Sequence, residues 1–321
     1  MNTTHPTLTA VVELARLAPS VHNTQPWQFS ADGDVLTLRR DESRRLGALD
    51  PDGRQQTISC GTAVHLARLG FRLQGFDPTV EVVRADGRSL VVRFRGVPGP
   101  GPSSSELAQG EAARSRHTQR GRFDGEPVTA DEVAALREAA QTQGAWVRFL
   151  ESPSDQAPLA VLLSRADEEE QDDEAYRAEL ATWTNRPKGA GDGVPADAAT
   201  LGTEPRTSGL RLREFVPAPH VAAAGSEAPA PERPLVAVLG TPGDSAADWL
   251  LAGQAMSAML LRATMAGVQA SPLGQVLDRP WARRRLAGEL GVVGHPQMVL
   301  RLGHARPGPA TPRRALDDLL A

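Results

Sequence analysis

The chain has 321 residues, of which 40% are hydrophobic and 23% charged, and its net charge is −4 at pH 7. These values are ordinary for a globular protein with enough residues for two compact units, and they give no reason to expect a nucleic-acid partner. A single cysteine, Cys60, excludes an internal disulfide, and no His, Asp or Glu cluster has metal-ligand spacing, so we expect no metal.

The first third of the chain has the pattern of two hairpins around a central helix. Apolar spacing predicts a helix over 7–18, strands over 27–30 and 35–39, and a buried helix over 55–75. Two further strands are expected over 80–84 and 89–95, joined by an Asp-Gly turn. The stretch 96–104, rich in Pro, Gly and Ser, is a predicted linker.

A second set of elements follows the linker. We expect a helix that carries residues 116–120 near its C-terminal end, and a helix over 129–143 that begins with a Thr129/Glu132 capping box. A strand over 146–150 and one long helix over 155–183 come next. Further strands over 235–239 and 298–302 flank a second buried helix, which begins near Ser245 and Asp248. Thr311 and Pro312 predict the start of a final helix.

Between these elements lies an irregular segment, 184–233, rich in Pro, Gly and Ala. Connections in compact domains are usually about 4–6 residues long, so this length indicates either a functional lid or disorder. The glycine-rich run 189–193 follows no predicted strand, and we interpret it as a flexible loop. Three arginines of the segment, Arg206, Arg211 and Arg213, could contact a ligand under such a lid.

The two buried helices are similar to each other. Gly61-Thr62-Ala63 precedes Gly75, and Gly253-Gln254-Ala255 precedes Gly267, at the same spacing. This internal repeat predicts two related half-units, 1–95 and 105–321. The short hairpins favour an α+β fold, with two related sheets packed around paired central helices.

The stretch Ala18 to Trp27 is the most informative motif. Pro19 ends the first helix, and Ser20, Asn23 and Gln25 then offer donors and acceptors that could surround a planar, polar-edged ligand. A plain connection is the alternative. The stretch resembles the A-P-S-x-x-N-x-Q-P-W signature of flavin nitroreductases, in which this loop lies against the isoalloxazine ring of FMN.

A second motif, Arg116-His117-Thr118-Gln119-Arg120, offers fixed cations and a hydroxyl that suit a phosphate monoester. A solvated basic face is the alternative. The motif resembles the R-x-S/T-x-K/R sequence that holds FMN in nitroreductases, which implies that Arg116, His117, Thr118 and Arg120 bind the cofactor. In that family Arg120 would stabilise charge on the reduced ring as the catalytic residue.

Two further stretches are similar to cofactor-binding parts of the same family. Pro272, Leu273 and Gly274 resemble a stretch whose backbone approaches the flavin ring, although the glycine comes one residue sooner here. Arg313 and Arg314 match C-terminal basic residues that reach the phosphate. An ordinary turn and a solvated helix start are the alternatives.

In the order of its motifs the chain is similar to the Acg-type branch of that family, in which one chain folds as a pseudo-dimer. The resemblance implies one FMN per chain, so a monomer suffices for the flavin site. It implies NAD(P)H-dependent reduction of a nitroaromatic, a quinone or a similar small acceptor. Two alternatives are a non-catalytic FMN-storage protein, with 184–233 as a lid over the flavin, and a flavoenzyme with one dedicated metabolite. No signal peptide or membrane span is evident, so we expect a cytoplasmic protein without membrane contact.

Overall fold

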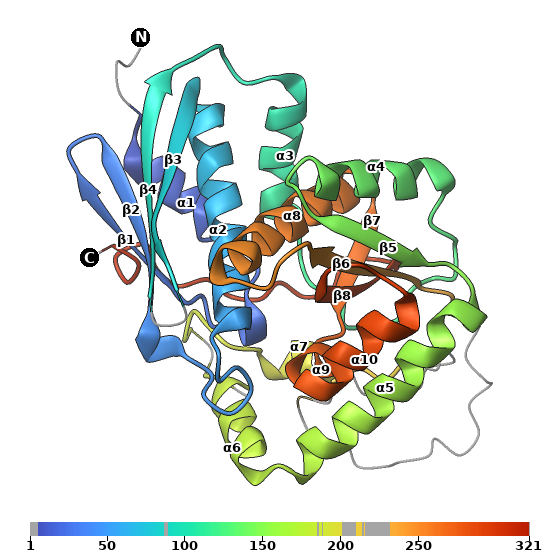
Figure 1. Cartoon of the computed structure of the whole chain (residues 1–321). Coiled ribbons are helices and arrows are strands. Elements are labelled where there is room, and N and C mark those ends of the chain that lie inside the picture. The colour runs from blue at the N-terminus through green and yellow to red at the C-terminus, as the bar shows by residue number, and fades with distance from the viewer. Residues whose placement is uncertain are drawn as a thin grey trace.

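The structure is a computed structural model. It describes residues 6–86, 89–184, 186–187, 189–200, 210–213, 215 and 232–320. Two four-stranded sheets lie on either side of a pair of long helices, α2 and α8, and the C-terminus lies beside the first sheet (Figure 1). The predicted α+β fold with two related half-units is confirmed.

The first half-unit contains a sheet in the order β1-β2-β4-β3, with every neighbour antiparallel. Its strands are β1 (Trp27–Asp32), β2 (Val35–Arg40), β3 (Phe76–Ala85) and β4 (Leu90–Pro98). Its helices are α1 (Leu8–Ala15) and α2 (Arg54–Leu73), with the short 3-10 turns η1 (Val21–Asn23) and η2 (Glu42–Arg44). Trp27, Phe29, Phe71 and Phe94 are buried between the sheet and these helices.

The second half-unit contains a sheet in the order β5-β6-β8-β7, again with antiparallel neighbours. Its strands are β5 (Trp146–Leu150), β6 (Leu235–Thr241), β7 (Val268–Pro272) and β8 (His295–His304). Its helices are α4 (Ala130–Gln141), α5 (Pro153–Asp172), α6 (Glu174–Trp183), α7 (Ala196–Thr200), α8 (Ala246–Met265), α9 (Gln275–Asp278) and α10 (Pro280–Leu290). Helix α3 (Ser104–Ser115) joins the halves.

The two halves have the same core topology. The series α1, β1, β2, α2, β3, β4 corresponds to α4, β5, β6, α8, β7, β8, and both sheets have equivalent strand orders. The second half differs by insertions, since α5 to α7 lie between β5 and β6, and α9 and α10 lie between β7 and β8.

The repeated glycines lie where the central helices cross. A Cβ on Gly61 would collide with the carbonyl oxygen of Leu250, and a Cβ on Gly253 would collide with that of Ile58. The close approach is therefore reciprocal, as a pseudo-twofold relation requires. Gly75 and Gly267 follow the two helices at φ +81° and +75°, a left-handed conformation that favours glycine, so they end the helices as predicted.

Three predicted helices differ from the structure, and the predicted linker over 96–104 begins inside β4, because residues 96–98 pair with β3. The predicted helix over 155–183 is two helices, because Asp173 has an extended backbone (ψ 106°) and its side chain accepts from the Tyr176 amide to begin α6. Residues 311–315 are not helical, because Arg314 donates its backbone N–H to Gln25 in the first half. Helix α3 ends before Arg116, so the second motif is not part of a helix. The predicted capping boxes at Thr129 and Ser245 are both present.

Candidate functional site

A pocket lies between the two half-units and is lined by both. It encloses about 1070 Å³ of space between atoms, including the part open to solvent. The first half contributes the loop after α1 and the start of α2, and the second half contributes the segment after α3, the end of β7, α8 and β8. The lining residues are Pro19, Ser20, Val21, His22, Gln55, Ile58, Ser59, Arg116, Thr118, Arg120, Leu212, Arg213, Phe215, Met256, Leu260, Ala270, Ser271, Pro272, Gly274, Asp278, Met298 and Leu300.

The loop between α1 and β1 has an unusual backbone. His22, Asn23 and Gln25 have φ of 47°, 55° and 49°, in the left-handed region that non-glycine residues seldom adopt. The Ser20 hydroxyl accepts from the Gln25 amide at 2.9 Å, which closes the turn. Such conformations cost free energy and persist only where surrounding contacts hold them. Pro19 and Ser20 line the pocket as a result of this turn.

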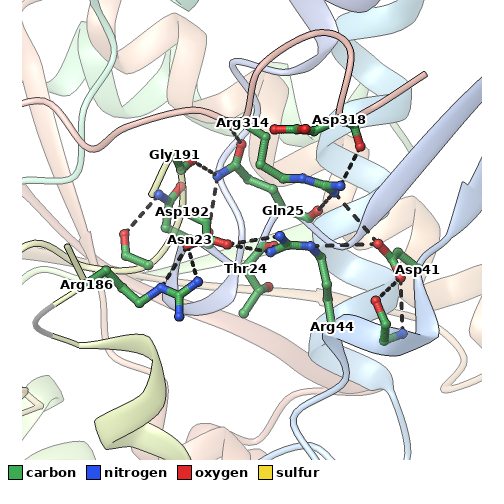
Figure 2. A network of polar contacts seen from close by, with 12 residues as sticks. Asn23, Thr24, Gln25, Asp41, Arg44, Arg186, Gly191, Asp192, Arg314 and Asp318 are labelled. Carbon is green, nitrogen blue, oxygen red and sulfur yellow. Dashed lines mark hydrogen bonds and ion pairs between the residues drawn. The ribbon is translucent and has the colours of Figure 1, made fainter. Parts of the chain in front are cut away.

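Asn23 and Gln25 lie in the same loop but do not line the pocket. The Asn23 amide donates to the carbonyl oxygens of Gly193 and Pro312, each at 3.0 Å. The Gln25 amide donates to Gly191 at 2.8 Å, and its oxygen accepts from the Arg314 backbone at 2.9 Å (Figure 2). Their side chains therefore connect the loop to two distant segments of the second half-unit.

The segment 116–120 lies against the end of β7. Thr118 forms a parallel bridge with Ala270, and the Gln119 amide donates to the Ala270 carbonyl at 2.8 Å. This pairing places Arg116, Thr118 and Arg120 in the pocket wall, while His117 lies outside the lining. A solvated basic face is thus excluded for Arg116, which is 7% exposed.

The guanidinium groups at this end of the pocket are buried near one another. Burial and the nearby Arg120 lower the pKa of Arg116 to about 10, and burial lowers the pKa of Arg120 to about 10. Burial, followed by Arg116, Arg16 and Arg120, lowers the pKa of Arg313 to about 9. Among the described residues, no carboxylate lies within 4.0 Å of Arg116 or Arg313. Arg116 and Arg120 thus bring two buried guanidinium groups to the pocket wall, and Arg313 lies nearby, outside the lining.

The remaining predicted site residues are divided between the pocket and the core. Pro272 and Gly274 line the pocket, whereas the Leu273 side chain is fully buried behind it and its amide donates to Val299. Arg313 donates to Asn23 and to the Leu17 carbonyl, so it lies behind the loop. Arg314 donates to the backbone of Gln25, Trp27 and Asp318, outside the pocket lining.

Part of the irregular segment reaches the pocket. The Arg213 guanidinium donates to Asp278 at 2.7 Å, contacts Glu170 at 3.3 Å and lies 2.7 Å from His22 Nε2. Phe215 lies between the two motifs, with its ring 5.5 Å from the Arg120 guanidinium and edge-on to His22 at 5.8 Å. The segment thus contributes side chains to the pocket, as a lid would.

Other parts of the segment are elsewhere or outside the described residues. Arg211 is exposed and lies 3.6 Å from Asp167, away from the pocket. Arg206, and with it residues 201–209 and 216–231, lies outside the described part of the chain. Whether 184–233 acts as a lid therefore stays a prediction.

Several pocket residues were not predicted from the sequence. Gln55 and Ser59 come from the start of α2, and Asp278 ends α9. Ser59 accepts from the Val21 amide at 3.1 Å and joins the loop to α2, whereas Gln55 donates to Asp278 at 2.9 Å and joins α2 to α9 of the second half-unit. Gln55 and Ser59 could have been predicted as site residues from the polar residues at the start of the central helix α2. Burial shifts two titratable groups here: it lowers the pKa of His22, with Arg213 and Arg120 adding to the effect, and it raises the pKa of Glu170 to about 7.

Among the described residues, no group of three or more His, Cys, Asp or Glu side chains could hold a metal ion. None of the helices in the same residues is long and apolar enough to cross a membrane.

The fold and the two motifs define the class of this protein. The sequence model of the nitroreductase family matches residues 113–304, and the chain belongs to this family. It is 31% identical to "Putative NAD(P)H nitroreductase Rv3131" of Mycobacterium tuberculosis, over 100% of this chain and 93% of that protein. It is 30% identical to "Putative NAD(P)H nitroreductase acg" of the same organism, over 97% and 94%. A crystal structure of a nitroreductase with bound FMN from Desulfitobacterium hafniense aligns with 15% identity and a TM-score of 0.39, over 65% of this chain and 93% of that one. The resemblance to the nitroreductase family and its Acg-type branch is confirmed.

Proposed function

We propose that the pocket binds one FMN and that the protein is an FMN-dependent oxidoreductase, which uses NAD(P)H to reduce a nitroaromatic, a quinone or a similar small acceptor. One observation carries this proposal: two motifs from opposite halves meet in one pocket whose wall holds the buried guanidinium groups of Arg116 and Arg120. Family membership supports the class of reaction.

The donors in the pocket fit the cofactor. Among the described residues no carboxylate lies within 4.0 Å of Arg116, and a buried cation favours a dianion, so Arg116 and the Thr118 hydroxyl would bind the phosphate of FMN. Arg313 lies behind the loop and would add its positive charge from there. Pro19, Ser20 and the turn at Pro272 and Gly274 would lie along the ring system, whose apolar part fits the Ile58, Met256, Leu260, Met298 and Leu300 side chains. When bound, FMN supplies two-electron transfer between a nicotinamide and an acceptor.

Arg120 is the proposed catalytic residue. It lies in the pocket wall and its pKa of about 10 keeps it cationic at neutral pH. A fixed cation beside the ring stabilises negative charge that develops on reduction.

One flavin site per chain follows from how the halves differ. The connection 16–26 between α1 and β1 carries the first motif, whereas only residues 142–145 connect α4 to β5. At that position Arg68 lies near the side-chain oxygens of Gln143 and Gln254, at 3.5 and 3.3 Å. The position in the second half-unit that corresponds to the 16–26 connection therefore lacks the loop that a second flavin would need. We propose that a monomer is sufficient for FMN binding.

A second candidate function is sequestration of FMN without turnover. The contacts of Arg213 and Phe215 in the pocket favour it, because side chains from 184–233 would then cover the flavin and hinder access of NAD(P)H and of an acceptor. Both candidates share the same cofactor site.

Two measurements separate these possibilities. The visible spectrum of the purified protein, followed by chromatography of the heat-released chromophore, should identify FMN. A colourless protein that takes up no added FMN would refute the proposed site. Steady-state oxidation of NADPH and NADH with nitroaromatic and quinone acceptors then distinguishes catalysis from storage, because storage predicts almost no turnover.

A further inference from the structure

The sequence predicts a flexible loop for the glycine-rich run 189–193, and in the structure this loop packs closely against other parts of the chain. Gly191 and Gly193 have φ of 75° and 72°, which favours glycine. A Cβ on Gly191 would lie 3.2 Å from the Arg313 carbonyl oxygen, and one on Gly193 would collide with Arg186 and the Trp183 carbonyl. The glycines thus permit close packing against the end of α6, Arg186 and the C-terminal segment.

Residues 191–193, named the clasp here, bind the strained loop after α1. The Gly193 amide donates to the Asn23 carbonyl at 3.2 Å, and the Asn23 side chain donates back to the Gly193 carbonyl at 3.0 Å. The Gln25 side chain donates to Gly191 at 2.8 Å. Two of the three left-handed residues in the loop are therefore hydrogen-bonded to the clasp.

Asp192 fixes the clasp through buried ion pairs. Its carboxylate is 3% exposed and accepts from both terminal nitrogens of Arg44 at 2.9 Å, and from Arg186 Nε at 2.9 Å. Arg44 also donates to the Thr24 carbonyl at 2.7 Å, so a single guanidinium connects Asp192 to the middle of the loop. Figure 2 shows Asp192 between Arg44 and Arg186, with Asn23 and Gln25 beside it.

We propose that Asp192 is a positioning residue for the flavin site, which acts by holding the Ser20–Gln25 loop in its strained conformation. Asp192 is absent from the pocket lining, so it would affect the flavin only through the loop. A left-handed backbone at three non-glycine positions persists only where surrounding contacts hold it, and the clasp provides many of the hydrogen bonds that hold this loop. This inference rests on the proposed FMN site.

The test is Asp192→Asn, which keeps the shape of the side chain but removes the charge shared by Arg44 and Arg186. Asp172→Asn is the matched control, because Asp172 is exposed at the end of α5. FMN is titrated into the apo form of each full-length protein, and hydrogen exchange is followed by mass spectrometry. We expect Asp192→Asn to bind FMN about ten- to a hundredfold more weakly. Exchange should rise in peptides covering 18–27 and stay unchanged in peptides of α2 and α8.

Affinity within twofold of wild type would overturn the proposal. So would faster exchange throughout the protein, because that pattern indicates a structural role alone. If Asp192→Asn does not fold, Arg186→Gln removes one ion pair and should give a smaller change with the same pattern. Failure of the wild-type protein to bind FMN would refute the proposed function instead. The exchange of 18–27 in Asp192→Asn would then still decide whether the clasp holds the loop.

Discussion

Replacing Arg116 should have opposite effects on the apo protein and on the flavin complex. Arg116 is 7% exposed and faces other guanidinium groups, which with burial lowers its pKa to about 10 from an ordinary value near 12.5. At about 1.36 kcal/mol for each pH unit, keeping this arginine charged costs the folded apo protein about 3 kcal/mol. This cost is fully present at any pH below about 10, the pKa of Arg116 in the folded protein. It disappears only as the pH rises from there towards 12.5, the pKa of the arginine in the unfolded chain.

Arg116→Met removes the charge while retaining much of the packing of the aliphatic stem. At pH 7.5 we therefore expect the free energy of unfolding of the apo protein to rise, by up to about 3 kcal/mol. FMN binding should weaken about ten- to a hundredfold, because a charge-assisted hydrogen bond contributes about 1.5–3 kcal/mol. Urea unfolding of the apo protein and fluorescence titration with FMN measure the two effects separately.

Arg114→Met is the control, because Arg114 belongs to the same basic stretch but is 56% exposed beside Glu111. It should change neither quantity appreciably, as exposed ion pairs contribute little. Unchanged FMN affinity in Arg116→Met would show that this end of the pocket does not hold the phosphate. A loss of apo stability would show that Arg116 contributes more through packing than it costs through burial.

Four further outcomes are expected. Arg120→Ala should make bound FMN harder to reduce by about 30 mV, if the lost interaction is near 1.4 kcal/mol, and an unchanged potential would remove Arg120 from the ring. A monomer in light scattering should carry flavin absorbance, whereas loss of flavin on dissociation of an oligomer would contradict the pseudo-dimer site. Arg213→Met should speed reduction of bound FMN by dithionite, while exposed Arg211→Met should not; equal rates would argue against a cover formed by this segment. Gly61→Ala should cost at least about 2 kcal/mol of stability, against less than about 0.5 for Gly101→Ala, which has open space around it. A small effect at Gly61 would mean that the central helices can separate cheaply.

The clasp changes how the lid hypothesis should be tested. Replacing residues 190–230 with a short linker would remove Gly191, Asp192 and Gly193 together with any cover over the pocket. Loss of FMN from such a variant would then report on the clasp and not on a lid. A replacement that begins after α7, at residue 201, keeps the contacts of 191–193 and separates the two effects.

Features that depend on local pattern could be predicted from the amino-acid sequence. Apolar periodicity and glycine placement located α2 and α8, and the repeat between them predicted the two half-units. Capping boxes located the starts of α4 and α8, because the side chain and the amide it accepts from are only three residues apart. The two motifs indicated one shared site, and the structure places Ser20 and Arg116 in the same pocket.

Features that depend on partners far along the chain could not be predicted from local pattern. Asn23 and Gln25 were assigned to the flavin by their motif, yet their amides bind residues 166 or more positions away. Residues 311–315 were expected to be helical, but the Arg314 amide bonds to Gln25 instead. The clasp, and the anchoring of Arg213 on Asp278, follow no local pattern. Hydrogen bonds and buried ion pairs between the half-units set these conformations, because a buried polar group without a partner costs free energy. The identity of each partner is fixed only when the two half-units come together.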